Sequence, residues 1–183
     1  MRIVHLPDVV TVLLDIVAWG VIHGGTGYLV HRVPVSWLER DRWLFAERRI
    51  EGGGRLYRRT LRITRWKDRL PEAGALFAGG VSKRHVPTAD GGGLERFVVE
   101  TRRAELGHWL AVVPSPLFAL WNPPVVAVVM VVYALAVNLP FVAIQRYNRI
   151  RSRRVLRRSS DLRSVPASDR RRSDRDTSGS SIP

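Results

Sequence analysis

The longest stretch without charge constrains the fold most. Residues 108–145 contain no Asp, Glu, Lys or Arg, although the whole chain carries 30 Lys+Arg and 16 Asp+Glu. The flanking segments are basic: residues 31–107 carry 17 basic and 10 acidic side chains, and residues 146–183 carry 12 and four. A soluble protein that binds an anionic partner does not need so long an uncharged block, whereas a chain that crosses a bilayer does. The pattern predicts an all-α integral membrane protein.

A second apolar block lies near the N-terminus, at residues 9–30. As a helix it is long enough to span a hydrocarbon core of roughly 30 Å, and its only charged residue is Asp15. A signal peptide is the competing interpretation. It fits less well, because the start is weakly basic, the apolar run is long and no small-residue cleavage site follows. We therefore predict a transmembrane helix at 9–30.

The uncharged block itself predicts a helical hairpin. Residues 105–121 and 124–145 are the two candidate spans, and the turn signal Asn122–Pro124 separates them. Two prolines are expected to kink the first of these helices, and Pro140 predicts a late kink in the second. Together with the N-terminal block, this makes about three transmembrane helices.

The distribution of arginine predicts the orientation. The region 31–104 and the tail 151–183 are both basic, so both are expected on the cytoplasmic side, with the N-terminus and the hairpin turn on the other. Within the cytoplasmic region, residues 34–50 and 55–71 predict amphipathic helices at the membrane interface, separated by Gly52–Gly54. The tail is rich in Arg and Ser and poor in apolar residues, which predicts disorder.

Composition also limits the partners and cofactors. Membrane lipid is a better partner for the arginines than nucleic acid, because anionic headgroups attract each Arg near the surface by about 1 kcal/mol. The chain has no cysteine, which excludes disulfides, thiolate nucleophiles and cysteine metal sites. It contains no Gly-rich phosphate loop, nucleophile elbow or zinc motif. One Glu-x-x-His motif is too few for a di-iron centre, so we expect no metal and no bound cofactor.

Charged side chains meet the uncharged block on a helix predicted to begin near Leu94. Thr101, Glu105 and His108 follow at spacings of four and three and so share one face, with Glu100 two turns before the histidine. A carboxylate one turn from an imidazole can fix its tautomer and stabilise its cation, as a general base requires. This predicts His108 as the base and Glu105 as its orienting group, with Glu100 as a substitute. The alternative is an interfacial helix with solvated Glu–Arg pairs.

Further polar residues lie at the predicted membrane boundary. Burying Asp15 at a helix centre would cost roughly 2.5–3.5 kcal/mol, so we expect it to face protein or a partner. A structural hydrogen bond to Asn138 or Tyr133 is the alternative to a functional role. Cations near the cytoplasmic interface, such as Lys67 and Arg146, are candidates to hold a phosphate or an oxyanion. Singly, such residues are more often positive-inside anchors.

Several segments together resemble the glycosyl-diaponeurosporenoate acyltransferase family. They are "LLDIVAWGVIHGGTGYLVHRVP", "RITRWKDRLPEAGALFAGGVSKRH", "ETRRAELGHWL", "WNPP" and "MVVYALAVNLPFVAIQRYNR". The resemblance covers about residues 9–150 in the family's order, so we predict one acyltransferase-like domain at 1–150, without the tail. It implies an integral membrane acyltransferase that esterifies a sugar hydroxyl of a glycosylated carotenoid. The residues that fall on the family's motif segments are Trp66, Lys67, Asp68, Glu100, Glu105, His108, Asn122, Asn138, Gln145, Arg146, Tyr147, Asn148 and Arg149.

The residues and the resemblance together predict acyl transfer to a sugar hydroxyl of an amphipathic glycosylated acceptor. The donor is a thioester or a lipid, with acyl-CoA as one possibility, and no prediction of oligomeric state follows. The predicted substrate-binding residues are Asp15, Lys67, Asp68, Asn138, Arg146, Asn148 and Arg149. The alternative function is a non-enzymatic membrane protein that binds lipid or assists assembly. In that case the side chains of Glu105 and His108 should diverge, with no cavity beside them.

Overall fold

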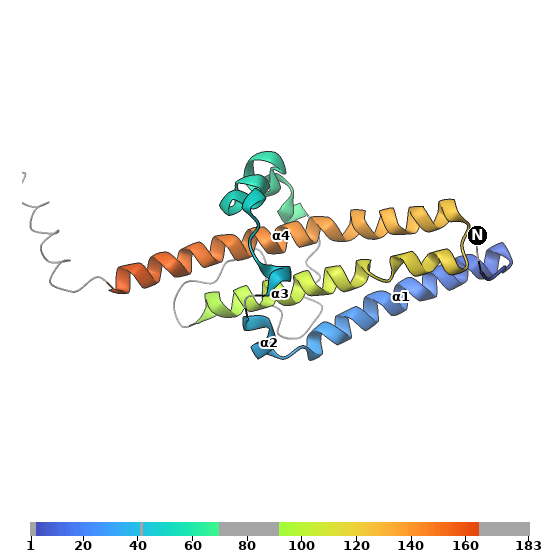
Figure 1. Cartoon of the computed structure of the whole chain (residues 1–183), viewed down its shortest axis with the longest axis horizontal. Helices are drawn as coiled ribbons and strands as arrows, with labels where there is room; N and C mark the ends of the chain where they lie inside the picture. Colours follow the sequence, from blue (N-terminus) through green and yellow to red (C-terminus); the bar gives the residue numbers. More distant parts are fainter. Residues whose placement is uncertain (1–2, 41, 70–91, 165–183) are drawn as a thin grey trace, which may run out of the picture.

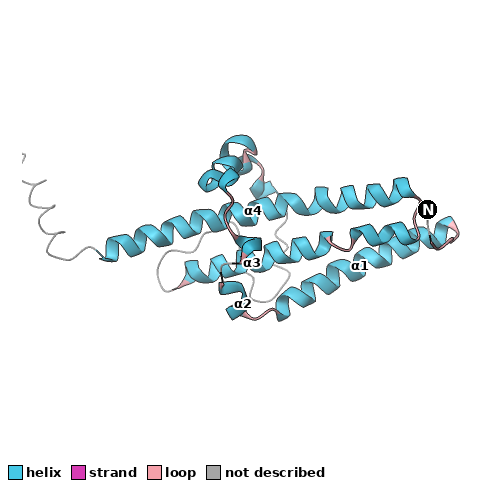
Figure 2. Ribbon diagram, in the orientation of Figure 1, coloured by secondary structure: helices cyan, strands magenta, loops and turns pink. Residues whose placement is uncertain are grey.

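The computed structural model describes residues 3–40, 42–69 and 92–164, and this part of the chain contains helices but no strand (Figure 2). Three long helices run side by side: α1 (Asp8–Arg32), α3 (Gly93–Val112) and α4 (Pro124–Ser164) (Figure 1). Helix α3 lies between the other two and packs against both. The prediction of an all-α chain is therefore confirmed for the described residues.

Two of the three predicted spans are helices long and apolar enough to cross a membrane. These are α1 and the apolar part of α4, in which only 11% and 22% of the most apolar window is buried inside the protein. The core helix of a soluble protein would be mostly buried, so exposed valines and leucines along both helices favour contact with lipid. The third predicted span, 105–121, is not one regular helix, because α3 ends at Val112 and the short helix η7 (Ser115–Leu120) follows. Two prolines at this junction account for the interruption.

The N-terminus and the α3–α4 turn meet at one end of the molecule (Figure 1). The backbone N–H groups of Ile3 and Val4 donate to the carbonyl oxygen of Leu120 at 2.9 and 3.0 Å. Asp15 accepts hydrogen bonds of 2.8 Å from the indole N–H of Trp121 and from the amide of Asn122. The buried carboxylate thus makes a structural hydrogen bond, but to the turn and not to Asn138 or Tyr133, the partners considered in the sequence analysis. Two donors to one carboxylate oxygen offset its removal from water.

The segment between α1 and α3 folds into short helices instead of the two long amphipathic helices predicted. It contains α2 (Val35–Glu39), η1 (Trp43–Phe45), η2 (Arg49–Gly54), η3 (Leu56–Thr60), η4 (Ile63–Arg65) and η5 (Lys67–Arg69). The glycines at the end of η2 have positive φ angles of 51°, 63° and 85°, and Arg62 is left-handed at 47°. Such residues end a right-handed helix. The predicted break at Gly52–Gly54 is confirmed, but the helices on either side are shorter than expected.

This segment is attached to α4 by an apolar cluster. Tyr57 and Ile63 pack against Ile144, Tyr147 and Ile150 of α4. Gly54 approaches the same surface, since a Cβ there would lie 3.6 Å from the Ile150 side chain and 3.8 Å from Tyr147. The short helices therefore lie over the middle of α4, where the sequence leaves the uncharged block and becomes polar.

Helix α4 continues to Ser164. The sequence predicts disorder from residue 151, and this is wrong for 151–164, where the α-helix extends beyond the other helices (Figure 1). Residues 165–183 lie outside the described part. Arginine and leucine have high helix propensity, and they can extend a helix that is already formed and packed. The prediction of disorder from composition leaves this out.

We expect Gly54→Ala to lower the free energy of unfolding by roughly 1–2 kcal/mol, because an L residue is strained at φ 85°. Gly20→Ala is the matched control: this glycine lies within α1, and nothing lies within 4 Å of its added Cβ. In a regular helix the same substitution should be neutral or stabilise by up to about 1 kcal/mol. Thermal unfolding in detergent micelles measures both, and equal effects of the two variants would contradict the strain argument.

Candidate functional site

A buried guanidinium joins three segments of the chain. Arg146 of α4 donates through Nε and Nη2 to Glu51 (2.7 and 3.0 Å) and through Nη1 to Glu105 (2.7 Å). Its remaining donors reach the carbonyl oxygens of Leu44 (3.0 Å) and Ala46 (2.7 Å). An arginine has five N–H groups, and here each has its own acceptor within the protein. Arg146 therefore has no N–H left for a substrate phosphate.

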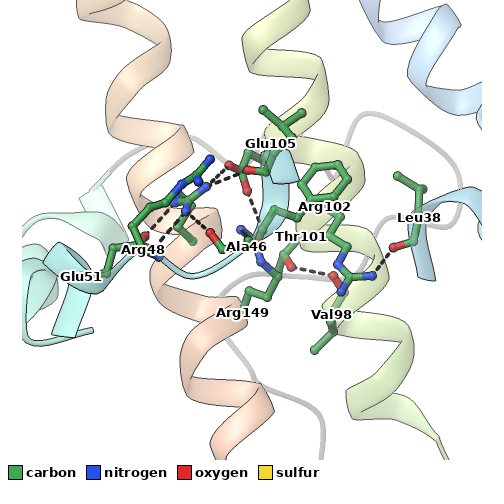
Figure 3. A network of polar contacts seen from close by, with 12 residues as sticks. Leu38, Ala46, Arg48, Glu51, Val98, Thr101, Arg102, Glu105 and Arg149 are labelled. Carbon is green, nitrogen blue, oxygen red and sulfur yellow. Dashed lines mark hydrogen bonds and ion pairs between the residues drawn. The ribbon is translucent and has the colours of Figure 1, made fainter. Parts of the chain in front are cut away.

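The second carboxylate oxygen of Glu105 faces Arg149. The two atoms, Oε2 and Nη1, lie 2.6 Å apart as an ion pair whose angles are not those of a hydrogen bond. Nη2 of Arg149 donates to the carbonyl of Phe45 at 3.2 Å. Figure 3 shows Glu51 and Glu105 directed toward α4 from its two sides. The sequence predicts Arg146 and Arg149 as substrate ligands, but in the structure their contacts are to the protein itself.

Glu51 is the carboxylate that sequence analysis missed. It is 2% exposed and accepts hydrogen bonds from Tyr57 and from the backbone N–H of Arg48, besides those from Arg146. Burial alone would raise the pKa of its carboxyl, but these hydrogen bonds outweigh burial and hold the pKa below its ordinary value of 4.5. The same burial and the neighbouring carboxylate raise the pKa of Tyr57. Glu51 directly precedes the three glycines, whose turn brings it to α4.

His108 has a neutral partner instead of the carboxylate predicted. Its Nδ1 lies 3.0 Å from Oδ1 of Asn138, and Nδ2 of Asn138 donates to the carbonyl of Ala134 at 2.9 Å. Because the second bond directs the amide nitrogen to its own helix, the oxygen faces the imidazole. An amide oxygen only accepts, so Nδ1 carries the proton and Nε2 carries the lone pair. Asn138 therefore does for the imidazole what the sequence assigned to Glu105.

A cavity of about 1130 Å³ lies beside this pair, between α1, α3 and α4. His108, Asn138, Phe141 and Gln145 line it on one side. The imidazole stacks on the ring of Phe141, with centroids 4.9 Å apart and planes at 10°. The lining extends along most of α3, but of α1 and α4 it includes only the later parts, from His23 of α1 and from Val137 of α4 onward. The surface of the cavity is mainly apolar, and polar and charged side chains are distributed along it. A large cavity that combines both kinds of surface suits an amphipathic ligand.

The other predicted site residues lie at different places. Glu100 lines the cavity and pairs with Arg103 at 3.4 Å. Lys67 and Asp68 form an ion pair of 2.6 Å with each other in η5 and do not line this cavity. Asn148 is buried outside the cavity lining, and Asp15 binds the α3–α4 turn. Of the predicted residues, the structure brings His108, Asn138 and Glu100 to the cavity.

We expect Arg146→Met to lower the free energy of unfolding by about 3–5 kcal/mol, since it leaves two buried carboxylates without their shared cation. Arg151→Met is the control, because this arginine is exposed on the same helix. Denaturant titration in micelles compares the two. A small effect of Arg146→Met would show that the guanidinium does not hold the three segments together.

The depressed pKa of Glu51 predicts a dependence of stability on pH. A group whose folded pKa lies below its unfolded pKa stabilises the protein above the unfolded value, and this stability is lost as the pH falls through the folded pKa. The free energy of unfolding of Glu51→Gln should therefore lie below that of the unchanged protein at pH 7, and the gap should narrow below about pH 4.5. Glu47→Gln, at an exposed position, should show no such gap. A gap that is constant down to pH 3 would contradict the prediction.

A family model and individual relatives of this chain both point to the same acyltransferase. The model of the family described as glycosyl-4,4'-diaponeurosporenoate acyltransferase matches residues 41–158. Two enzymes with that name, from Staphylococcus aureus strains MRSA252 and bovine RF122 / ET3-1, are 28% and 27% identical over 139 residues, 76% of this chain and 84% of theirs. No solved structure matches. The family model covers more than half of the sequence, including His108, Asn138 and the whole Arg146 cluster, and the chain therefore belongs to the glycosyl-4,4'-diaponeurosporenoate acyltransferase family and is an acyltransferase.

Proposed function

We propose that this chain is a membrane acyltransferase that esterifies a sugar hydroxyl of a glycosylated carotenoid or a similar glycolipid. The names of its relatives describe an acyltransferase that acts on glycosyl-4,4'-diaponeurosporenoate. An acceptor of this kind has a polar sugar and a long apolar tail. The apolar lining of the cavity and its position between exposed, lipid-compatible helices suit such a molecule.

The observation that carries the proposal is the His108–Asn138 pair in the wall of this cavity. With the proton on Nδ1, Nε2 accepts the proton of the acceptor hydroxyl as its oxygen attacks the acyl carbonyl. Asn138 holds the ring in this tautomer and stabilises the imidazolium that forms. The imidazolium then returns the proton to the leaving group of the donor. The alternative, a non-enzymatic lipid-binding protein, predicts no cavity beside His108.

The depth of the pair suits an acceptor embedded in lipid. Asn138 follows Pro124 by 14 residues (138 minus 124), which is roughly 21 Å along a helix. In a hydrocarbon core of about 30 Å, the pair lies within the membrane and closer to the end that carries the arginines. The positive-inside rule makes that end cytoplasmic, with the N-terminus and the α3–α4 turn outside. The tail of an acceptor can then remain in lipid while its sugar reaches the imidazole.

The donor reaches the same cavity from the cytoplasmic end. Gly92, Arg96 and Arg153 line the cavity there. A thioester such as acyl-CoA carries phosphates that arginines at this mouth can bind, while its acyl chain extends along the apolar wall. Arg96 at this mouth thus replaces Arg146 and Arg149 as the proposed phosphate ligand, since the latter two bind Glu51 and Glu105.

We expect His108→Ala to lower kcat by about 100- to 10,000-fold, the usual contribution of a general base. Asn138→Leu should also lower kcat, because the imidazole loses the acceptor that fixes its tautomer. His5→Ala, at an exposed site outside the cavity, is the control. Ester formation is measured by mass spectrometry in membranes supplied with acyl-CoA and a glycosylated carotenoid. Full turnover by His108→Ala would refute the proposed base.

The acceptor is tested by lipid extraction from a strain lacking the gene. Loss of an acylated glycolipid, with accumulation of its unacylated form, identifies both the reaction and its substrate. An unchanged lipid profile would contradict the proposed function.

A further inference from the structure

Gln145 is a buried polar side chain with an unsatisfied donor in the wall of the cavity. It is 2% exposed, and its Nε2 has no hydrogen-bond acceptor within the described ranges. It lines the same cavity as His108. The great majority of buried amide donors in proteins have a hydrogen-bond acceptor, so a donor without one calls for an explanation. Neither the fold nor the proposed action of His108 uses this donor.

The position of Gln145 relative to the imidazole follows from helix geometry. Asn138, Phe141 and Gln145 are spaced three and four residues apart and form one strip on α4. The imidazole stacks on Phe141, in the middle of this strip. The Cα of Gln145 lies roughly 6 Å further along the axis, and side chains of a helix lean toward its N-terminus, which here is the direction of His108. The amide therefore comes within reach of an acyl carbonyl that is attacked beside the imidazole.

We propose that Gln145 is a catalytic residue whose Nε2–H group donates a hydrogen bond to the oxyanion of the acyl-transfer intermediate. The inference rests on the proposed function, to which it adds the second half of the reacting site. Rotation about the last torsion of the side chain, which is broad and two-fold, exchanges the positions of the amide oxygen and nitrogen. This rotation brings the N–H group to the cavity surface without any movement of the helix.

The step can be written with all atoms balanced. The acceptor oxygen forms a bond to the acyl carbon, its proton passes to Nε2 of His108, and the carbonyl π electrons move to the carbonyl oxygen. That oxyanion accepts the hydrogen bond from Gln145. When the carbonyl re-forms, the bond from the acyl carbon to the donor's sulfur or oxygen breaks, and the leaving group takes the proton from His108. The products are the ester and the deacylated donor.

A donor without an acceptor in the resting state suits this role, because its hydrogen bond forms only in the transition state. A donor that already bonds a protein acceptor must break that bond in the transition state. A donor held without an acceptor gains a bond only when negative charge develops, in a site from which water is excluded. The protein instead loses stability in the resting state, since a buried unsatisfied amide destabilises the fold.

Gln145→Met tests the proposal through two readouts that change in opposite directions. The side chain keeps its length but loses the donor, so kcat should fall by about 100- to 1000-fold, with KM for the acceptor little changed. The thermal unfolding temperature should stay the same or rise, because an unsatisfied polar group is removed. Ser152→Ala is the matched control: its hydroxyl is also buried on α4 without a partner in the described residues, but it lies outside the cavity lining. It should retain full kcat.

The outcomes separate this inference from the proposed function. If the unchanged protein forms no ester, the proposed function itself fails. If it forms ester, and Gln145→Met is folded and keeps its kcat, the oxyanion role is wrong. A rise in KM at constant kcat would also contradict the oxyanion role, because it would show that Gln145 binds the acceptor in the ground state. If Gln145→Met is unstable, kcat is measured instead for Gln145→Ala, whose smaller side chain cannot overpack the helix interface.

Discussion

The attachment of Arg146 to Glu51 and Glu105 determines the rest of the structure. One guanidinium bonds a carboxylate of η2, a carboxylate of α3 and two backbone carbonyls between α2 and η2. Glu105 is one turn from His108 on α3, so the ion pair sets the axial position of α3 against α4. That position brings His108 opposite Asn138 and Phe141. Because both carboxylates are almost fully buried, neither can leave the guanidinium without a large loss of stability.

The topology proposed above would relate the chemistry of each polar group to its depth in the membrane. Arg146 follows Pro124 by 22 residues (146 minus 124), or roughly 33 Å of helix, which places the ion cluster beyond a hydrocarbon core of about 30 Å. On the topology proposed above, His108 and Asn138 lie within that core. There a carboxylate beside the imidazole would be costly to bury, whereas an amide fixes the tautomer without a second charge. On this topology, the cost of desolvation accounts for an amide beside the imidazole inside the core and an ion cluster at the surface.

The sequence predicts those parts of the fold that depend on local patterns. The uncharged block and the Asn-Pro-Pro signal locate α4 and the turn, and α3 begins at Gly93, beside the predicted Leu94. The helical spacing correctly places Glu105 and His108 on one helix, but spacing within a helix carries no information about the neighbouring helix. The partners of both residues come from α4: Arg146 binds Glu105 and Asn138 contacts His108, whereas the sequence predicts both as substrate ligands. Glu51 escapes notice because its burial depends on three glycines with positive φ. Gln145 lies on a motif segment, but its burial beside the cavity does not follow from the sequence, because a polar residue at the end of an apolar run resembles a membrane boundary.

The glycines of α1 have a different role from the close helix packing that their number suggests. Nothing lies within 4 Å of a Cβ added at Gly20, Gly24 or Gly25, whereas Gly107 of α3 does approach Val30 of α1. Thr26 and Gly27 line the cavity opposite the imidazole. The small side chains of α1 therefore leave space beside the site. Helix α1 is held on either side of them: Trp19 stacks on Phe118 and donates to Met130, and Arg103 donates to the last carbonyls of the helix. Between Trp19 and Val30, small residues of α1 border the cavity, and on the proposed function they leave room for the apolar tail of an acceptor to pass sideways into lipid.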